Sequence, residues 1–239
     1  MELLPFVRSY IKNSTTIFCN LKHFTIPEGA LLFSADAKSM YTNIDIATGV
    51  SALRDFISSN AKNLPPNFPT TLFLQILTYV MENNIFTFGD TYWLQLSGTA
   101  MGTPAACTYA TIFYGQHENN SILPLFKDQL LYYKCYIDDI FGIWFPPNRD
   151  SITIWNNLRK ELNNWGKLEW VIEEPSTTTT FLDLNISIQQ SKILTSTYQK
   201  DVNLYLYIPS SSSHPPSCFK GLLANELRHY NIHTTKKIL

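Results

Sequence analysis

The chain has 239 residues, of which 45% are hydrophobic and 15% charged, and its formal net charge is −1 at pH 7. This composition is that of an ordinary globular protein, and the length allows one large domain or two small ones. The near-zero charge excludes a general electrostatic attraction to polyanions, so a nucleic-acid partner would have to bind at a local patch.

Cysteine spacing and hydropathy bear on where the protein works. The four cysteines are far apart and form no C-x-x-C pair, so the sequence suggests neither a zinc site nor a disulfide framework. No apolar run reaches the length of a membrane span, and Glu2 and Pro5 lie where a signal peptide needs a basic start and an apolar core. We therefore expect an intracellular protein without a membrane partner, and the sequence does not choose between nucleus and cytoplasm.

The first third of the chain predicts a strand and two helices after a weakly patterned segment, residues 1–29. The apolar run ALLFSADA predicts a strand that meets Asp36 near its end. Asp45 is a good N-cap for the next helix, whose apolar residues recur at helical spacing. After the breaker LPPNFP, Pro69 and Thr70 open a second amphipathic helix.

The middle of the chain predicts a hairpin, a glycine loop and a third helix. IFTFGDTYWLQLSG alternates like two strands with a turn at its Gly-Asp pair. The loop SGTAMGTP follows, and we expect Thr103 to cap the next helix and Pro104 to begin it. Gly98 and Gly102 would let this main chain approach a ligand closely, with a helix N-terminus beyond it that favours negative charge, although a merely flexible connection is an equal alternative.

The run LLYYKCYIDDIFGIWF places Asp138 and Asp139 in one of the most apolar stretches of the chain. Neighbouring side chains of a strand point to opposite faces, so a continuous strand would bury one of the two carboxylates. A hairpin with the pair at its tip avoids this cost. Ordinary turn residues would explain the turn but not two adjacent acids, whereas a divalent cation such as Mg²⁺ would explain both.

A cation needs a further ligand, and two other acids belong to apolar strands. Asp36 lies at the end of the first strand, where its alternative role is that of a turn or cap residue. Asp183 in FLDLNISI is a weaker candidate, because we expect it in the middle of a strand with no turn residue beside it.

The rest of the chain predicts a helix over SITIWNNLRKELNNW, strands near LEWVIEE and FLDLNISI, and a short helix over CFKGLLANELRHY. Strands and helices are mixed without regular β-α-β repetition. The pattern favours an α+β fold, with helices packed on one face of an antiparallel sheet.

Three segments, taken in order, carry a resemblance to a known family. FSADAKSMYTNI, GTAMGTPAA and YIDDIF resemble motifs A, B and C of reverse transcriptases. Their sequences are most similar to those of the Penelope-like retroelement group. FLDLNISI looks like that group's strand after the palm motifs, and TYQKDVNLYLYIPSSSSHPPSCFKGLLANELRH looks like its entry into the thumb. The resemblance covers nearly the whole chain from about Ile26 onward.

This resemblance implies an RNA-directed DNA polymerase with the right-hand architecture of that family. The palm would occupy residues 30–190, the start of a helical thumb residues 191–239, and a remnant of the fingers or a linker residues 1–29. Its partners would be an RNA template, a DNA primer and deoxynucleoside triphosphates. Because the fingers would be largely absent, a partner chain or a missing segment would have to supply the basic clamp for the triphosphate.

The resemblance also implies roles for single residues. Asp36 and Asp138 would bridge two Mg²⁺ ions, or Mn²⁺, with Asp139 as an assisting carboxylate, for in-line transfer to the primer 3′-hydroxyl. The main-chain carbonyl of Ala37 would complete one ion's shell. Tyr41 would exclude a 2′-hydroxyl from the incoming sugar, or else simply pack where strand meets helix. The remaining substrate contacts would come from Gly102, Thr103, Pro104 and Tyr136.

Two alternatives stay open at the level of sequence. The fold and the acids can persist without polymerisation, in a catalytically inactive, truncated remnant that binds nucleic acid or is only structural. A palm-type nucleotidyl cyclase also uses strand-end carboxylates and two metals, although YIDD and GTAMGTP argue against it. A C-terminal basic excess suits a nucleic-acid backbone or a solvated surface, and it consists of Lys192, Lys200, Lys220, Arg228, Lys236 and Lys237 against Asp201 and Glu226.

Overall fold

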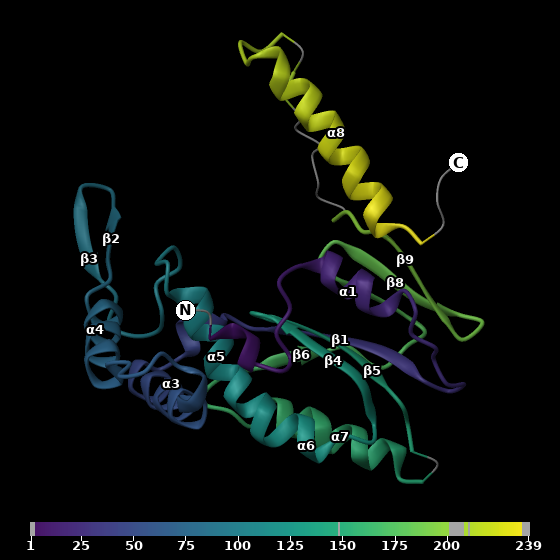
Figure 1. Cartoon of the computed structure of the whole chain (residues 1–239), viewed down its shortest axis with the longest axis horizontal. Coiled ribbons are helices and arrows are strands. Elements are labelled where there is room, and N and C mark those ends of the chain that lie inside the picture. The colour runs from purple at the N-terminus through teal and green to yellow at the C-terminus, as the bar shows by residue number, and fades with distance from the viewer. Residues whose placement is uncertain (1–2, 148, 201–207, 210, 236–239) are drawn as a thin grey trace.

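A four-stranded antiparallel sheet lies at the centre of the protein (Figure 1). The structure is a computed structural model, and it describes residues 3–147, 149–200, 208–209 and 211–235. The strands lie side by side in the order β4-β5-β1-β6. Their bounds are Leu31–Ala37 for β1, Leu130–Tyr136 for β4, Asp139–Trp144 for β5 and Trp170–Ile172 for β6.

Helices cover one face of this sheet. Side chains alternate along β1, so that Phe33, Ala35 and Ala37 belong to the larger hydrophobic core. The buried faces of four helices contribute to the same core. These helices are α3 (Ile46–Ser59), α4 (Thr70–Glu82), α5 (Ala106–His117) and α7 (Ser151–Leu162).

The opposite face is covered by a helix and a second sheet, so helices are not confined to one side. Leu32 on β1 and Phe141 on β5 belong to the second core, which they share with α1 (Ser14–Leu21). The second sheet is antiparallel, with three strands in chain order. They are β7 (Thr178–Phe181), β8 (Leu184–Gln189) and β9 (Lys192–Thr197).

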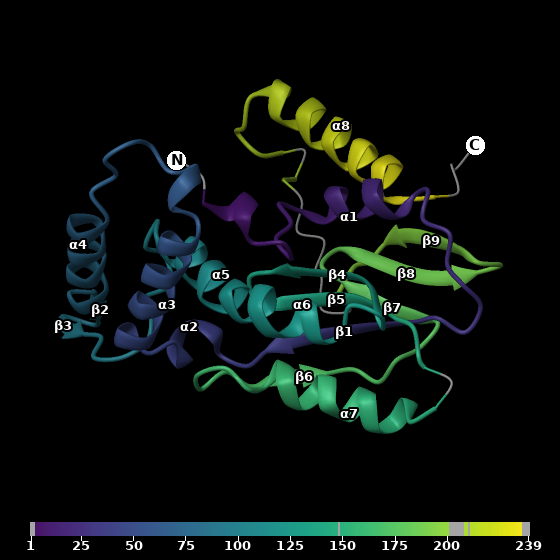
Figure 2. The same ribbon diagram turned by 60° about the horizontal axis from the view of Figure 1, so that its bottom comes forward.

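Two extensions project from this centre. The hairpin of β2 (Ile85–Phe88) and β3 (Thr91–Leu94) continues from α4, and in Figures 1 and 2 both elements lie at one end of the molecule. Helix α8 (Pro216–His233) projects from another part of the molecule, where it contacts α1 and β9. The short elements are η1 (Leu4–Phe6), α2 (Met40–Asn43), η2 (Ala61–Asn63), the π-helical turn η3 (Glu118–Ile122) and α6 (Leu123–Leu125).

Several local predictions are confirmed. The side chain of Asp45 caps α3, because its carboxylate accepts a hydrogen bond from the Thr48 main-chain N–H at 3.0 Å. Helix α4 begins at Thr70, directly after Pro69, as the breaker predicted. The segment IFTFGDTYWL forms the expected hairpin with its turn between Phe88 and Thr91.

Two local predictions are wrong. Thr103 does not cap α5, because its hydroxyl donates to the main-chain oxygen of Ala100 at 3.1 Å and the helix begins only at Ala106. The loop therefore closes on itself before the helix starts. Asp183 is not in the middle of a strand: it lies in the turn between β7 and β8, where Leu182 adopts the left-handed conformation with φ +54°.

The first residues of the chain pack against the free edge of β4. The main-chain N–H of Cys135 donates to the main-chain carbonyl of Ser9 at 2.9 Å. The main-chain N–H of Ile11 donates to the carbonyl of Cys135 at 3.4 Å. Part of the expected thumb entry, residues 201–207 and 210, lies outside the described residues, and so do Lys236 and Lys237. Across the described residues, every helix is too short or too polar to cross a bilayer.

Candidate active site

The tip of the β4–β5 hairpin carries the two adjacent aspartates, as the apolar flanks predicted: Asp138 lies in the turn and Asp139 begins β5. Tyr136 pairs with Asp139 across the hairpin, which leaves Ile137 and Asp138 as its two turn residues. Ile137 takes φ +56°, a conformation that a β-branched residue rarely adopts. Strain of this kind costs about 1–3 kcal/mol and persists only where neighbouring structure enforces it.

The third acid, Asp36, lies opposite this turn. In the antiparallel pairing of β1 with β5, Asp36 is the register partner of Asp139. The main-chain N–H of Ala37 donates to the carbonyl of Asp138 at 2.8 Å, which ties the end of β1 to the turn. Acids about a hundred residues apart in the chain therefore meet at one end of the sheet.

A glycine helps to set this register. Gly142 lies opposite Phe33, and a Cβ atom at Gly142 would come within 2.2 Å of the Phe33 ring. That ring also packs edge-on against Trp155 of α7, with centroids 5.2 Å apart. Because only glycine leaves room for the ring here, a one-residue slip of β1 along β5 would place Phe33 against a side chain and move Asp36 away from Asp139.

Both aspartates at the hairpin tip have a raised pKa. Burial raises the pKa of Asp138, and the charge of Asp36 adds to the rise. Burial also raises the pKa of Asp139 to about 6, with the charges of Asp138 and Asp36 adding to the rise and that of Lys200 opposing it. Half-buried carboxylates that repel one another form a site that a cation would stabilise.

The donor chemistry of this site fits Mg²⁺ in combination with a substrate. Among the residues that the structure describes, no three His, Cys, Asp or Glu side chains are grouped closely enough to hold an ion by themselves. Mg²⁺ in nucleotide-processing sites is commonly held by one or two carboxylates, with substrate phosphates and waters as the other ligands. Asp36, Asp138 and Asp139 offer such oxygen ligands.

A cavity of about 670 Å³ opens beside the acids, on the face of the central sheet that carries α1 and the second sheet. Asp36, Asp139 and Tyr136 line it, and so does Lys200, for which the sequence indicated only a part in the C-terminal basic excess. Asp183 lies on its wall as well, but its carboxylate is 3.5 Å from Nδ1 of His233 in α8. Asp183 therefore belongs to the contact between the turn and α8.

Tyr41, in α2, is held by the glycine loop. The main-chain N–H of Thr99 donates to the carbonyl of Tyr41 at 2.6 Å, and the phenol oxygen is 3.3 Å from Sγ of Cys107. Gly98 has φ +76°, and a Cβ there would lie 2.6 Å from Cα of Thr42. Burial is the largest cause of the raised pKa of Tyr41. The contact with Cys107 and the charge of Asp138 raise it further. The start of the loop thus packs against the residue that sequence analysis assigned to the sugar.

The other predicted loop residues lie apart from these contacts. Gly102 is exposed, with φ +98° and nothing within 4 Å of a Cβ built on it. Thr103 and Pro104 follow it in the loop before α5. Within the described residues, no hydrogen bond joins these three to Asp36, Asp138 or Asp139. Their expected place under a template base stays a prediction.

Sequence reasoning missed a buried acid behind β4. Glu118 is 1% exposed, in the π-helical turn that follows α5. Its carboxylate accepts hydrogen bonds from the hydroxyls of Tyr133, at 2.9 Å, and Ser9. Burial raises its pKa to about 7. Glu118 thereby ties the N-terminal segment to the strand that leads into the Asp138 turn, and no sequence pattern around GQHENNSI indicates this.

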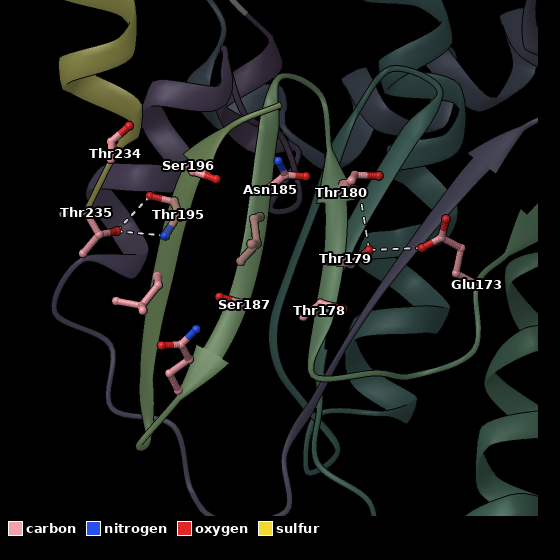
Figure 3. Close-up of a pocket in the computed structure, with 13 residues that line it drawn as sticks. Glu173, Thr178, Thr179, Thr180, Asn185, Ser187, Thr195, Ser196, Thr234 and Thr235 are labelled. Carbon is pink, nitrogen blue, oxygen red and sulfur yellow. Dashed lines mark hydrogen bonds between the residues drawn. The ribbon is translucent and has the colours of Figure 1, made fainter. Parts of the chain in front are cut away.

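A second pocket, of about 650 Å³, lies on the three-stranded sheet and is lined mainly by hydroxyl and amide side chains (Figure 3). Glu173 at its edge accepts hydrogen bonds from Ser34, at 2.7 Å, and Thr179, at 3.1 Å. Glu173 and Thr180 also line the cavity of the acids. Glu173 is the one charged residue among the described residues that line this pocket, so the candidate chemistry lies at Asp36 and the β4–β5 turn.

Comparison with known proteins gives matches in structure. No protein-family model matches the sequence, and no curated protein matches it. The telomerase of Candida albicans, in complex with a fragment of telomeric RNA, matches 79% of this chain and 34% of its own, with a TM-score of 0.60 and 12% identity. The apo telomerase of Candida tropicalis, truncated from its C-terminal domain, matches 78% of this chain and 40% of its own, with a TM-score of 0.57 and 14% identity.

A viral polymerase gives a similar result. The RNA-dependent RNA polymerase of BmCPV, at its elongation state, matches 76% of this chain and 18% of its own, with a TM-score of 0.52 and 14% identity. The chain thus spans less than half the length of each of these proteins. At such low identity the likeness concerns the fold alone. The chain has an α+β fold similar to the palm of RNA-templated polymerases.

Proposed function

We propose that this chain is the palm, with the beginning of the thumb, of a reverse transcriptase of the Penelope-like retroelement group. Its reaction is RNA-directed nucleotidyl transfer to a primer 3′-hydroxyl. One observation carries the proposal: Asp36 at the end of β1 is the register partner of Asp139, beside Asp138 at the tip of the β4–β5 hairpin. The palm-like fold supports it, and the order of the three motifs favours a reverse transcriptase.

In this proposal each residue at the sheet end has a defined task. Asp36, Asp138 and Asp139 bind Mg²⁺, or Mn²⁺, together with the triphosphate, and the main-chain carbonyl of Ala37 is a further oxygen ligand. The bound ions would activate the primer hydroxyl and stabilise the charge of the leaving pyrophosphate. Because burial and the neighbouring carboxylates raise the pKa of Asp138 and of Asp139, a bound cation would favour the ionised form of both.

The neighbouring residues orient the substrates. Tyr136 borders the cavity next to Asp139, where it supports the primer end. Tyr41, fixed by Thr99 and Cys107, limits the space at the 2′ position of the incoming sugar. The partners are then an RNA template, a DNA primer and deoxynucleoside triphosphates. A segment or chain with the role of the fingers would supply the cationic clamp for the triphosphate.

Template-dependent primer extension tests this function. The purified chain, alone and with a candidate fingers segment, is given an RNA template, a labelled DNA primer, deoxynucleoside triphosphates and Mg²⁺ or Mn²⁺. We expect extension that depends on the template and falls at least about 10³-fold in Asp138→Asn, since metal ions contribute several kcal/mol to transition-state stabilisation. Asp128→Asn is the matched control, because Asp128 is exposed and precedes the start of β4, whereas the aspartates of the site follow its end. Product formed without template would contradict the proposal and favour a cyclase.

A second candidate is an inactive remnant that binds nucleic acid. The observation in its favour is that, within the described residues, no group of three His, Cys, Asp or Glu side chains is arranged to hold an ion by itself. Fluorescence anisotropy with the same labelled primer–template separates the two candidates. Binding without extension in either metal, with or without a fingers segment, would support the remnant and exclude the polymerase.

A further inference from the structure

Helix α4 has two apolar faces, and one of them points outward. Its inner face packs into the core through Leu74, Leu77 and Met81. Its outer face carries Leu72, Ile76, Tyr79 and Val80, which are 54%, 55%, 69% and 40% exposed. The spacing of these four residues places them in one stripe along the helix. A stripe of this kind is typical of a helix that packs against another element on its outer side.

The hairpin that follows extends this apolar surface. Phe86, Phe88 and Trp93 share one face of the hairpin and are 52%, 77% and 54% exposed. Tyr92, which is 80% exposed, lies on the other face. A two-stranded hairpin is marginally stable in water without further packing. Among the described strands, β2 and β3 pair only with each other, so both outer edges of the hairpin are available. We call the outer stripe of α4 together with this hairpin the α4–hairpin surface.

Charge excludes a nucleic acid as the occupant of this surface. Between residues 64 and 117 the only charged side chains are Glu82 and Asp90, and both are acidic. A phosphate backbone requires lysine or arginine, which this stretch lacks. The stripe itself carries no charge, so covering it with apolar side chains would leave no ion desolvated. The surface therefore fits an apolar protein partner.

The exposed apolar area approaches what each partner contributes to a standard interface. A buried aromatic side chain covers about 150–250 Å². Tyr79 of α4 and the three aromatic residues on one face of the hairpin, Phe86, Phe88 and Trp93, are each more than half exposed and therefore present roughly 500 Å². The aliphatic residues of α4 add to this area. A standard interface needs about 800 Å² from each partner, and the largest apolar patch on a typical monomer is about 300–600 Å².

We propose that the α4–hairpin surface binds the same surface of a second copy of this chain, in a two-fold symmetric dimer. An uncharged helical stripe is complementary to itself under two-fold rotation, because both copies present aliphatic side chains at the same spacing. An antiparallel strand edge is likewise complementary to itself. The interface lies at the end of the molecule away from α8 (Figure 1), and it does not depend on the proposed polymerase function.

Sedimentation equilibrium of the purified chain from about 1 to 100 μM tests this proposal. We expect a monomer–dimer equilibrium whose dissociation constant rises at least about tenfold in Ile76→Lys, because hot-spot residues of an interface carry most of the affinity. Leu223→Lys is the matched control: Leu223 is 66% exposed on α8, outside the surface, and its replacement should leave the dimer unchanged.

Hydrogen exchange identifies the interface in the same samples. Amides of residues 70–94 should exchange more slowly as the protein concentration rises through the dissociation constant, while those of α8 should not change. A monomer over the whole concentration range would overturn the proposal. So would a dimer that persists in Ile76→Lys and Phe88→Lys, one that is lost in Leu223→Lys, or assembly that grows without limit.

Discussion

Glu118→Gln is expected to stabilise the protein at alkaline pH. In the folded state burial raises the pKa of Glu118 from 4.5 to about 7, although hydrogen bonds from Ser9 and Tyr133 oppose the rise. The folded protein therefore binds the Glu118 proton more tightly than the unfolded chain does. The contribution of Glu118 to the free energy of unfolding is fully present below pH 4.5 and is lost as the pH rises to about 7.

The size of the effect on the unfolding free energy follows from the rise in the pKa of Glu118. One pKa unit corresponds to about 1.4 kcal/mol, so the change from 4.5 to about 7 corresponds to about 3 kcal/mol of unfolding free energy. Glutamine has nearly the same shape and is neutral at every pH. Relative to wild type, Glu118→Gln should therefore gain up to about 3 kcal/mol between pH 4.5 and pH 8.

Urea unfolding at several pH values between 4.5 and 8.5 measures this difference. Glu169→Gln is the control, because the Glu169 side chain is 68% exposed in its ion pair with Lys38 and should give a nearly constant difference from wild type. A Glu118→Gln difference that does not change with pH would refute the reasoning. So would a variant that loses stability, relative to wild type, as the pH rises.

Three glycine substitutions test the backbone of β5 and of the glycine loop. Gly142→Ala should lower the unfolding free energy by about 1–3 kcal/mol, because the new methyl group would overlap the Phe33 ring, and thermal unfolding should show the loss. In the loop, Gly98→Ala should cost about 3 kcal/mol and Gly102→Ala only about 1–2 kcal/mol. Both residues have positive φ, but only at Gly98 would a Cβ meet main-chain atoms of Tyr41 and Thr42. Equal losses at the two loop positions, measured by urea unfolding, would contradict this explanation.

The hairpin tip could be predicted from sequence because its cause is local. Two adjacent acids in an apolar run cannot both avoid the core unless the strand turns between its halves. The position of Asp36 opposite Asp139 has a different origin. It depends on pairing between strands far apart in the chain and on a fit between Phe33 and Gly142, which local patterns do not contain.

The errors and omissions have similar causes. Thr103 and Pro104 match the pattern of a helix start, but a hydrogen bond within the loop satisfies the Thr103 hydroxyl instead. The turn at Asp183 was missed because Leu182, which gives no turn signal, takes the left-handed conformation there. Glu118 was missed because a single buried acid reveals its partners only after the N-terminal segment has folded against β4.

In the proposed reaction, Asp36 and Asp138 act as one catalytic unit. Single-turnover incorporation of one nucleotide should be measured for wild type, Asp36→Asn, Asp138→Asn and the double variant, on the same RNA template and DNA primer. Residues that act as a unit give strongly non-additive losses. We predict that each single variant loses at least about 10³-fold in rate and that the double variant loses little more. Full activity of Asp36→Asn, or a double variant whose loss is the product of the two single losses, would contradict the account.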